Sequence, residues 1–186
     1  MTKQRCFGEG DPLMSQYHDE EWGVPVYDDR QLFEKLILDG FQAGLSWRTV
    51  LYKREAFQEA FDGFDPEKIA AYTDEDRERL LANEGIIRNR LKIDATISNA
   101  QAFLDMQARG LSFSEFLWSF VEGEPQQGPE ASSWEQARTV SPEAEAMSKA
   151  LKSHGFKFVG PTICYAFMQA VGMFDDHLTS CFRYSG

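Results

Sequence analysis

The sequence predicts an all-α domain. Its apolar residues recur at helical spacing, these segments begin or end at recognisable capping signals, and no alternating strand pattern persists. The chain has 186 residues with 15 Phe and 4 Trp, which is enough apolar material for a packed domain rather than a disordered chain. We therefore expect a single domain over residues 1–186, built from seven or eight helices.

Helix signals mark the elements of this domain in turn. Side chains of Asp, Ser and Thr can accept hydrogen bonds from the free N–H groups at a helix start, and glycine can end a helix. Between these signals, apolar side chains form the stripes that predict the core. The expected helices are one over about 30–39 after Asp28 and Asp29, one from Ser46 that carries Val50, Leu51, Phe57 and Phe61, a short one from Asp65-Pro66, one from Thr73 and Asp76 to Gly85, one with Ile93, Ile97, Ala100 and Leu104 that Gly110 ends, and one from Ser112 and Glu115.

Residues 122–140 interrupt the helical pattern. They are rich in Glu, Gln, Pro, Gly and Ser, and this composition predicts a surface loop. The loop is long for a compact domain, which is typical of a mobile segment.

A glycine-bounded hairpin over residues 155–160 (GFKFVG) separates two further helices. The helix before it starts at 141–143 (SPE), with a cap, a proline and an early acid, and runs to His154. The helix after it begins with backbone N–H groups that have no partner inside the helix, which makes a natural seat for a phosphate. The glycines let a nucleic-acid backbone come close. This segment alone leaves open an ordinary corner between two core helices.

The net charge of −11 counts against a protein whose main partner is nucleic acid, because phosphate contacts need Lys or Arg. However, residues 88–92 and 149–157 are basic, so the charge distribution still permits one basic face. The sequence has neither a long apolar run nor the apolar core of a signal peptide. We therefore expect a cytoplasmic protein without a membrane partner.

The two ends of the chain carry potential metal ligands. Cys6 and His18 lie near the start, and His177 and Cys181 lie near the end at a spacing that suits one helical turn. Two thiolates and two imidazoles complete a closed tetrahedral zinc site, which would tie together chain ends that otherwise fray. Spacing alone also permits four unrelated residues, since such His–Cys pairs are common. We assign the remaining cysteine, Cys164, to the core.

Residues 39–47 (DGFQAGLSW) join two helices through a turn that contains glycine. Gly44 and Leu45 can present an apolar tip on an exposed turn, and such tips act as wedges in distorted nucleic acids. Trp47 opens the next helix. Taken alone, this segment favours a simple corner between two helices with a buried Trp.

Short motifs along nearly the entire chain occur in the order of one known family. They are Cys6, 11–13 (DPL), 17–19 (YHD), 21–25 (EWGVP), 42–47 (QAGLSW), 85–89 (GIIRN), 116–120 (FLWSF), 148–152 (SKALK), 155–160 (GFKFVG), 162–165 (TICY) and 176–177 (DH). On these motifs the chain resembles the DNA-3-methyladenine glycosylase I family, in register from about residue 5 to 182 with only small gaps.

The resemblance implies a fold, an activity and a site. It implies the helix-hairpin-helix DNA glycosylase fold, with that motif at about 142–171, and a base-excision repair enzyme that releases 3-methyladenine from double-stranded DNA by base flipping. No lysine follows the hairpin where lyase-type relatives carry one, so we expect a monofunctional enzyme, acting as a monomer. The implied residues are Cys6, His18, His177 and Cys181 for a structural Zn²⁺, Tyr17, Trp22, Trp47 and Phe7 for the substrate, Asp39 as the catalytic residue whose carboxylate recognises the base, and Gly44, Leu45, Gly155, Lys157, Gly160 and Thr162 for DNA.

Some positions depart from the family pattern. Its best-known members have Glu at position 39, and they have Trp and Tyr where this chain has Phe7 and Met14. The shorter Asp39 withdraws the carboxylate by about 1.5 Å, one C–C bond. Asp175 or Asp176 could replace it as the functional acid, because other helix-hairpin-helix glycosylases carry an aspartate after the hairpin. We favour a different role for Asp176, which is to orient the zinc ligands.

The alternative function is a non-catalytic or altered-specificity DNA-binding relative of this family. Tyr17, Trp22 and Trp47 argue against a pure binder, because a pure binder needs no base pocket. An unrelated helical interaction protein with a structural zinc would show no salt-dependent DNA binding.

Overall fold

The computed structural model describes residues 3–186, and the chain is mostly helical, as predicted. The predicted caps Asp28, Ser46, Ser112 and Ser141 each accept a hydrogen bond from the backbone N–H three residues later. The elements are α1 Pro12–Glu20, α2 Asp29–Gln42, α3 Trp47–Tyr52, α4 Arg54–Ala60, the 3₁₀ helix η1 Asp62–Phe64, α5 Pro66–Ala70, α6 Asp74–Leu81, α7 Arg90–Ala108, α8 Phe113–Trp118, the 3₁₀ helix η2 Ser119–Val121, β1 Gln126–Gln127, α9 Pro142–Ser153, α10 Pro161–Ala170 and β2 Phe174–Asp175.

The structure differs from the predicted elements in several places. Residues 3–186 contain ten α-helices rather than seven or eight, because α1 was not predicted and the helix expected from Ser46 to Phe61 breaks at Lys53, where the backbone has φ −100° and ψ 0°. Helix α6 ends at Leu81 instead of continuing to Gly85. The strands β1 and β2 pair in parallel, contrary to an all-α domain. Strands of two residues are too short to show an alternating pattern in the sequence.

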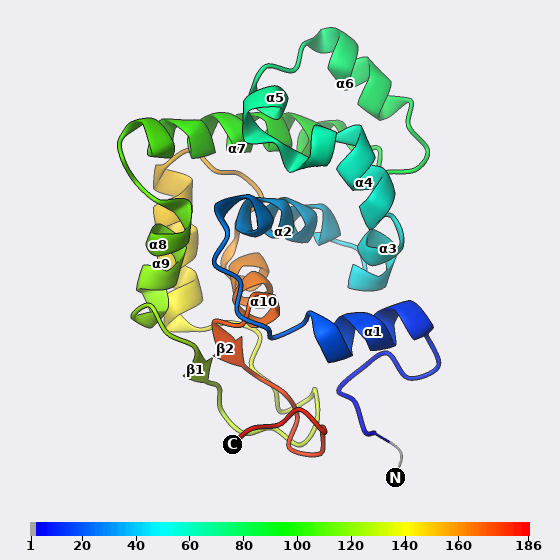
Figure 1. Ribbon diagram of the computed structural model, residues 1–186, viewed down its shortest axis with the longest axis vertical. Coiled ribbons are helices and arrows are strands. Elements are labelled where there is room, and N and C mark those ends of the chain that lie inside the picture. Colours follow the sequence, from blue (N-terminus) through cyan, green and yellow to red (C-terminus); the bar gives the residue numbers. More distant parts are fainter. Residues whose placement is uncertain (1–2) are drawn as a thin grey trace.

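Helix α2 runs through the middle of the molecule, between α7 and α10 (Figure 1). Its side chains Leu32, Phe33, Leu36 and Phe41 are at most 1% exposed. Burying one such side chain contributes about 1.5–3 kcal/mol, so this face anchors α2 in the core. Helix α10 packs against both α2 and α9. The positions of α2 and α10 are therefore fixed relative to one another by direct packing.

The C-terminal end of α2 is capped by Lys92 of α7. The buried ammonium donates hydrogen bonds to the carbonyl oxygens of Phe41 at 2.8 Å and Ala43 at 2.7 Å. Carbonyl groups at a helix end have no intrahelical donor, and a cation is favoured there. Lys92 belongs to the basic segment 88–92. Because its ammonium is buried, this charge does not contribute to a basic surface.

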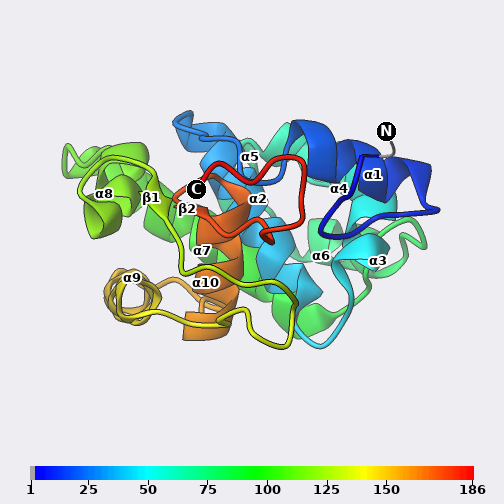
Figure 2. The ribbon, with the colours of Figure 1, turned by 90° about the horizontal axis from the view of Figure 1, so that it is seen from below.

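Residues 122–140 form a loop, as predicted, which runs across α10 (Figure 2) and is bonded both to the N-terminal segment and to α10. The Trp134 Nε1 donates to the carbonyl oxygen of Cys6 at 2.9 Å. The Arg138 guanidinium donates to the hydroxyl of Tyr165 on α10. The polar composition of the loop predicts only that the segment lies at the surface, so it did not indicate these long-range contacts.

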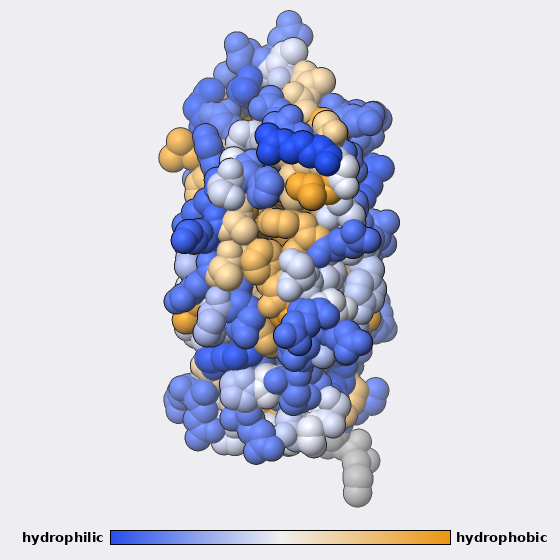
Figure 3. All heavy atoms as spheres, turned by 90° about the vertical axis from the view of Figure 1, so that its left-hand side faces the viewer, coloured by the Kyte–Doolittle hydropathy of each residue, from blue (hydrophilic) through white to orange (hydrophobic). Residues whose placement is uncertain are grey.

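The outer face formed by α8 and α9 carries a strip of hydrophobic side chains bordered by hydrophilic ones (Figure 3). No helix within residues 3–186 has both the length and the apolar character needed to cross a bilayer.

Candidate functional site

A cavity of about 280 Å³, with five aromatic residues among the twelve that line it, lies beside α1, α2, α3 and α10. The ring centroids of Tyr17 and Trp47 are 5.3 Å apart, as are those of Phe7 and Trp22. We call this space the aromatic cavity; its size and lining suit one flat ring system. The four predicted substrate-binding residues and Asp39 all lie around it. Its lining is Phe7, Met14, Tyr17, Trp22, Lys35, Asp39, Gln42, Trp47, Trp134, Ala166, Gln169 and Ala170.

Asp39 supplies the carboxylate of the aromatic cavity. It lies in the last turn of α2 rather than at the predicted helix end, because α2 continues to Gln42. The residue is 3% exposed, and its Oδ1 accepts a hydrogen bond from Lys35 Nζ at 2.8 Å. Its Oδ2 is buried and has no hydrogen-bond partner within residues 3–186. Burial raises the pKa of Asp39, and the neighbouring Lys35 opposes that rise. The cavity therefore offers a buried acceptor that a ligand can satisfy.

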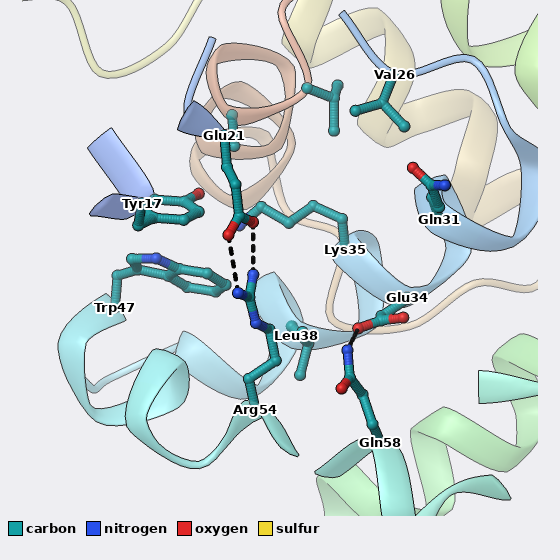
Figure 4. A pocket seen from close by; sticks show the side chains of 12 residues that line it. Tyr17, Glu21, Val26, Gln31, Glu34, Lys35, Leu38, Trp47, Arg54 and Gln58 are labelled. Atoms are coloured by element: carbon teal, nitrogen blue, oxygen red, sulfur yellow. Dashed lines mark hydrogen bonds and ion pairs between the residues drawn. The ribbon is translucent and has the colours of Figure 1, made fainter. Parts of the chain in front are cut away.

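Lys35 was not predicted as a site residue. Its Nζ lies 3.3 Å from the centroid of the Trp47 ring and 5.6 Å from that of Tyr17 (Figure 4). Burial lowers the pKa of Lys35, and Asp39 opposes that shift. The sequence held a signal for this contact, since Lys35 and Asp39 are four residues apart on one helix and so share a face.

A second cavity of about 330 Å³ lies on the other side of Lys35. The Arg54 guanidinium donates to both carboxylate oxygens of Glu21, at 2.6 and 2.9 Å, and the Gln58 amide donates to Glu34 at 2.6 Å (Figure 4). We call this space the charged cavity, because two acidic and two basic residues line it. The Lys35 side chain lines both spaces and so forms the partition between them.

Trp134 is a further lining residue that the sequence analysis missed. It comes from the loop 122–140 and is 45% exposed, with its rings 6.2 Å from Trp22 and 6.5 Å from Phe7. A single large aromatic residue in an otherwise polar loop was the available signal, because loops often carry binding residues.

A groove of about 200 Å³ connects the turn after α2 with the start of α10. Gly44 and Leu45 line one side, and Thr162 lines the other. Leu45 is 45% exposed, and Gly44 has a φ of +78°, a conformation that favours glycine. Asp39 lines both this groove and the aromatic cavity. The predicted wedge and the predicted phosphate seat thus share one surface beside the cavity.

Hydrogen bonds to a side chain of α7 hold the backbone of the hairpin over 155–160 in place. Asn99 of α7 donates to the Lys157 carbonyl oxygen at 3.0 Å and accepts from the Lys157 N–H at 2.8 Å, while the Lys157 residue stays exposed. Gly155 has a φ of +91°, so the turn itself favours glycine there. Gly160, the N-cap of α10, has a φ of −62°, and a Cβ built on it meets no atom within 4 Å. The fold does not require a glycine at position 160.

Three of the four predicted zinc ligands come together. The ligand atoms of Cys6, His18 and Cys181 are all buried and lie within 4.8 Å of one another. The ring of His177 lies 5.6 Å from that of His18, and its buried Nε2 has no hydrogen-bond partner in the described part of the chain. Two thiols and two imidazoles are the donor types of a tetrahedral zinc site, and His177 lies next to His18, although its nitrogen is outside the group of three. His177 and Cys181 lie in irregular chain rather than on the predicted helical turn.

Carboxylates orient both imidazoles. Asp19 Oδ1 lies 2.8 Å from His18 Nδ1, and Asp175 Oδ1 lies 2.7 Å from His177 Nδ1. A partner on Nδ1 leaves Nε2 available to a metal. Asp176 was expected to orient the zinc ligands, but in the structure its neighbour Asp175 makes the contact with His177.

Asp176 belongs to a different network. Its carboxylate accepts hydrogen bonds from the hydroxyl of Tyr165 and from Gln169 Nε2, the latter at 2.8 Å. A Cβ at Gly128 would lie 1.5 Å from Asp176 Oδ1, so glycine makes room for this carboxylate. Asp176 does not line the aromatic cavity.

The group at the chain ends and the aromatic cavity share a wall. The ring centroids of Phe7 and His18 are 4.9 Å apart, and those of Trp22 and His177 are 4.8 Å apart. The positions of Phe7 and Trp22 therefore depend on the order of the imidazoles behind them.

A family model described as methyladenine glycosylase matches residues 7–184. The chain belongs to this family. The DNA-3-methyladenine glycosylase 1 of Escherichia coli (strain K12) is 52% identical over 184 residues, which cover 98% of each chain. The DNA-3-methyladenine glycosylase of Haemophilus influenzae is 50% identical over 180 residues, which cover 95% of this chain and 96% of the relative.

Solved structures extend the methyladenine glycosylase assignment to the fold. A crystal structure of 3-methyladenine DNA glycosylase I has a TM-score of 0.95 at 56% identity, covering 98% of this chain and 100% of the other. The Staphylococcus aureus enzyme has a TM-score of 0.91 at 43% identity, with coverages of 97% and 96%. A variant of 3-methyladenine DNA glycosylase I in complex with 3-methyladenine has a TM-score of 0.89 at 42% identity, covering 98% of both chains. The family predicted from the sequence motifs is confirmed.

Proposed function

We propose that this chain is a monofunctional DNA-3-methyladenine glycosylase, which hydrolyses the N-glycosidic bond of 3-methyladenine in alkylated double-stranded DNA. The observation that carries the proposal is an aromatic cavity with one buried carboxylate, Asp39, whose Oδ2 has no partner within residues 3–186. Membership of the methyladenine glycosylase family supports the same activity.

The aromatic cavity recognises the base after it leaves the DNA stack, because its bond to the sugar is unreachable in the duplex. Methylation at N3 gives the adenine a positive charge. The face of Trp47 attracts that charge, which contributes about 2 kcal/mol or more once the site is desolvated. Asp39 Oδ2 accepts a hydrogen bond from the exocyclic amine and complements the charge.

The positive charge of the base also provides most of the chemistry. It weakens the glycosidic bond, so the base leaves without first being protonated. Water forms a C–O bond at the sugar carbon as the C–N bond breaks, the electron pair of the C–N bond neutralises the base, and the extra proton of the attacking water passes to solvent. This chain therefore needs no side-chain nucleophile, and the hydrolysis leaves an uncleaved abasic strand.

The groove beside the cavity holds the DNA. Gly44 and Leu45 enter the space that the extruded base vacates, as apolar wedges do in distorted duplexes. The backbone N–H groups of Gly160 and Thr162 face a DNA phosphate at the start of α10. Gly155, whose own N–H donates to the Lys152 carbonyl oxygen, allows the close turn, and Lys157 adds a positive charge.

Gly160→Val tests the phosphate seat. The open space around position 160 accepts a side chain, so the variant should fold normally, but its branched Cβ blocks the approach of a DNA backbone. We expect affinity for duplex DNA of any sequence to fall roughly tenfold, the equivalent of about 1.4 kcal/mol. Fluorescence anisotropy with two unrelated duplexes measures this effect, and unchanged affinity in a stably folded variant would contradict the assignment.

Lys157→Ala tests the charge on the hairpin. Removing one phosphate contact should lower the slope of log affinity against log salt concentration by about 0.9. Lys68→Ala is the matched control, because Lys68 is also exposed but lies on α5. Equal slopes for the two variants would place the Lys157 side chain away from the DNA.

Cys6, His18, His177 and Cys181 are the residues that would hold one structural zinc ion. Four protein ligands leave no position open for water, so the metal would cross-link the two chain ends and take no part in the reaction. The orphaned Nε2 of His177 supports this assignment.

Product analysis tests the proposed activity. The purified protein is incubated with duplex DNA treated with a methylating agent, and the freed bases are identified by chromatography. Release of 3-methyladenine with an intact abasic strand is the expected result. The alternative, a non-catalytic or altered-specificity relative acting as a DNA binder, predicts salt-dependent duplex binding without that release. In this proposal the protein acts as a monomer in the cytoplasm.

A further inference from the structure

The indole of Trp134 forms an exposed wall of the aromatic cavity. Trp134 is 45% exposed, whereas Tyr17 and Trp22, which line the same cavity, are 4% and 8% exposed. The proposed function assigns no role to this side chain. An indole that lines a cavity and is open to solvent becomes buried when a flat ligand fills the space beside it.

Contacts on both sides of the loop tip hold this indole in place. Its Nε1 donates to the Cys6 carbonyl oxygen at 2.9 Å. Earlier in the loop, the Ala131 carbonyl oxygen accepts a hydrogen bond from the Thr179 N–H at 2.9 Å. Later in the loop, the Arg138 guanidinium donates to the Tyr165 hydroxyl. Because the wall is already ordered, little side-chain freedom is lost when a ligand packs against it.

The aromatic rings follow one another around the cavity, with Trp134 at the end away from Trp47. The ring centroid of Tyr17 lies 5.3 Å from that of Trp47 and 6.3 Å from that of Phe7. The centroid of Phe7 in turn lies 6.5 Å from that of Trp134. In the proposed function, Trp47 and Asp39 bind the ring that carries the amine. Trp134 therefore bounds the opposite end of the same space.

We propose that Trp134 is a specificity-determining residue, which packs against the second ring of a cationic base and so favours methylated purines over methylated pyrimidines. The inference rests on the proposed function, which places the six-membered ring against Trp47 and its amine on Asp39. The five-membered ring of a purine carries the bond to the sugar, so it lies toward the open side of the cavity, where the indole is exposed. A methylated pyrimidine held by the same two residues has no second ring to place there.

The contact with Trp134 changes the ratio of the two affinities rather than both affinities alike. A methylated cytosine and a methylated adenine each bring one positive charge and one exocyclic amine, so Trp47 and Asp39 attract both. Only the two-ring base buries area against the indole of Trp134. Loss of this indole therefore weakens the binding of the purine and leaves that of the pyrimidine nearly unchanged.

Binding of two small cations to the intact protein tests this role. The probes are the 3,9-dimethyladeninium and 1,3-dimethylcytosinium cations, which have the same charge and an amine beside the ring but differ in the second ring. Calorimetric titration gives Kd for each. In Trp134→Ala, we expect the preference for the two-ring cation to fall about tenfold, which is typical for the loss of an apolar contact in a pocket. Trp134→Phe, which keeps an aromatic face, should retain most of the preference.

Tyr27→Ala is the matched control. Tyr27 is 53% exposed and stacks on Trp118 with ring centroids 4.5 Å apart, but it does not line the cavity. This variant should bind both cations as the wild type does. Thermal unfolding checks every variant, and Trp134→Leu serves as the second substitution should Trp134→Ala fold poorly.

Equal losses for the two cations in a folded Trp134 variant, or no loss for either, would overturn the role of Trp134. A wild-type protein without a preference for the two-ring cation would overturn it as well. Release of 3-methyladenine by the wild-type protein is measured in parallel and tests the proposed function separately. Normal release with an unchanged preference in the variant removes only the role of Trp134, whereas no release and no binding of either cation removes both proposals.

Discussion

Asp39→Asn is expected to cut the single-turnover release of 3-methyladenine on the order of a hundredfold while leaving duplex binding unchanged. The substitution keeps the size of the side chain and removes its charge. A hydrogen bond to a charged group contributes about 1.5–3 kcal/mol, and roughly 2.7 kcal/mol corresponds to a hundredfold change in rate. Asp39 lines the DNA groove as well as the aromatic cavity, but the residue is only 3% exposed, so the loss should appear in base release and not in DNA affinity.

Asp176→Asn is the matched control for this prediction. It makes the same chemical change in a second acid, one whose carboxylate bonds to Tyr165 and Gln169 and does not line the cavity. We expect this variant to lose stability and to release base at close to the normal rate once folded. An inactive Asp176 variant beside a normal Asp39 variant would reverse the assignment of the acid.

Asp39→Glu is expected to keep or raise the rate of release. The added methylene restores the reach of the residue that the best-known family members carry at this position. In this chain the longer carboxylate also remains close to Lys35, whose Nζ now lies 2.8 Å from Asp39 Oδ1. A large loss of activity would show that the cavity is shaped around the shorter side chain.

If the proposed zinc ion is bound, its removal is expected to destabilise the protein by several kcal/mol and to disorder the aromatic cavity at the same time. A ligand present at a thousandfold above its Kd contributes about 4 kcal/mol to the folded state, and structural zinc commonly binds at least that tightly. Phe7 and Trp22 pack against the imidazoles of His18 and His177, so loss of the metal should also weaken base binding. Elemental analysis should find one zinc per chain, and a chelator should lower Tm.

Cys181→Ala and Cys164→Ala form the matched pair for the metal. Both cysteines are buried, but only Cys181 belongs to the cluster with Cys6 and His18. The Cys181 variant should lose the metal, whereas the Cys164 variant should lose only packing energy in the core and retain one equivalent. A metal-free protein with unchanged Tm would rule out a structural zinc.

Local features of the chain were predictable because they depend on neighbouring residues. The caps Asp28, Ser46, Ser112 and Ser141 satisfy N–H groups three residues away, and the apolar stripes follow from the helical repeat. The hairpin at 155–160 was also predictable, because its glycines and the two flanking helices are neighbours in the sequence. The family followed from short motifs that keep their order along the chain, and no packing information was needed to see them.

The contents of the site depended on contacts between distant segments. Trp134 reaches the cavity from a polar loop, and Lys92 crosses from α7 to cap α2. Asp175, rather than Asp176, meets His177 because the irregular chain after β2 sets which side chain faces inward. Composition and periodicity carry no information about such contacts.

The sequence by itself determined most of the helices and their caps, the family and the candidate residues of the pocket and the metal group, but it indicated neither α1 nor the break at Lys53. The tertiary structure alone decided that the ammonium of Lys35 lies between Asp39 and Trp47. The helical repeat places Lys35 and Asp39 on one face, but only the packing of α3 against α2 brings the indole over the pair and shields it from water. The physical reason is that burial, which makes a charge pair consequential, is a property of the assembled fold rather than of any one segment.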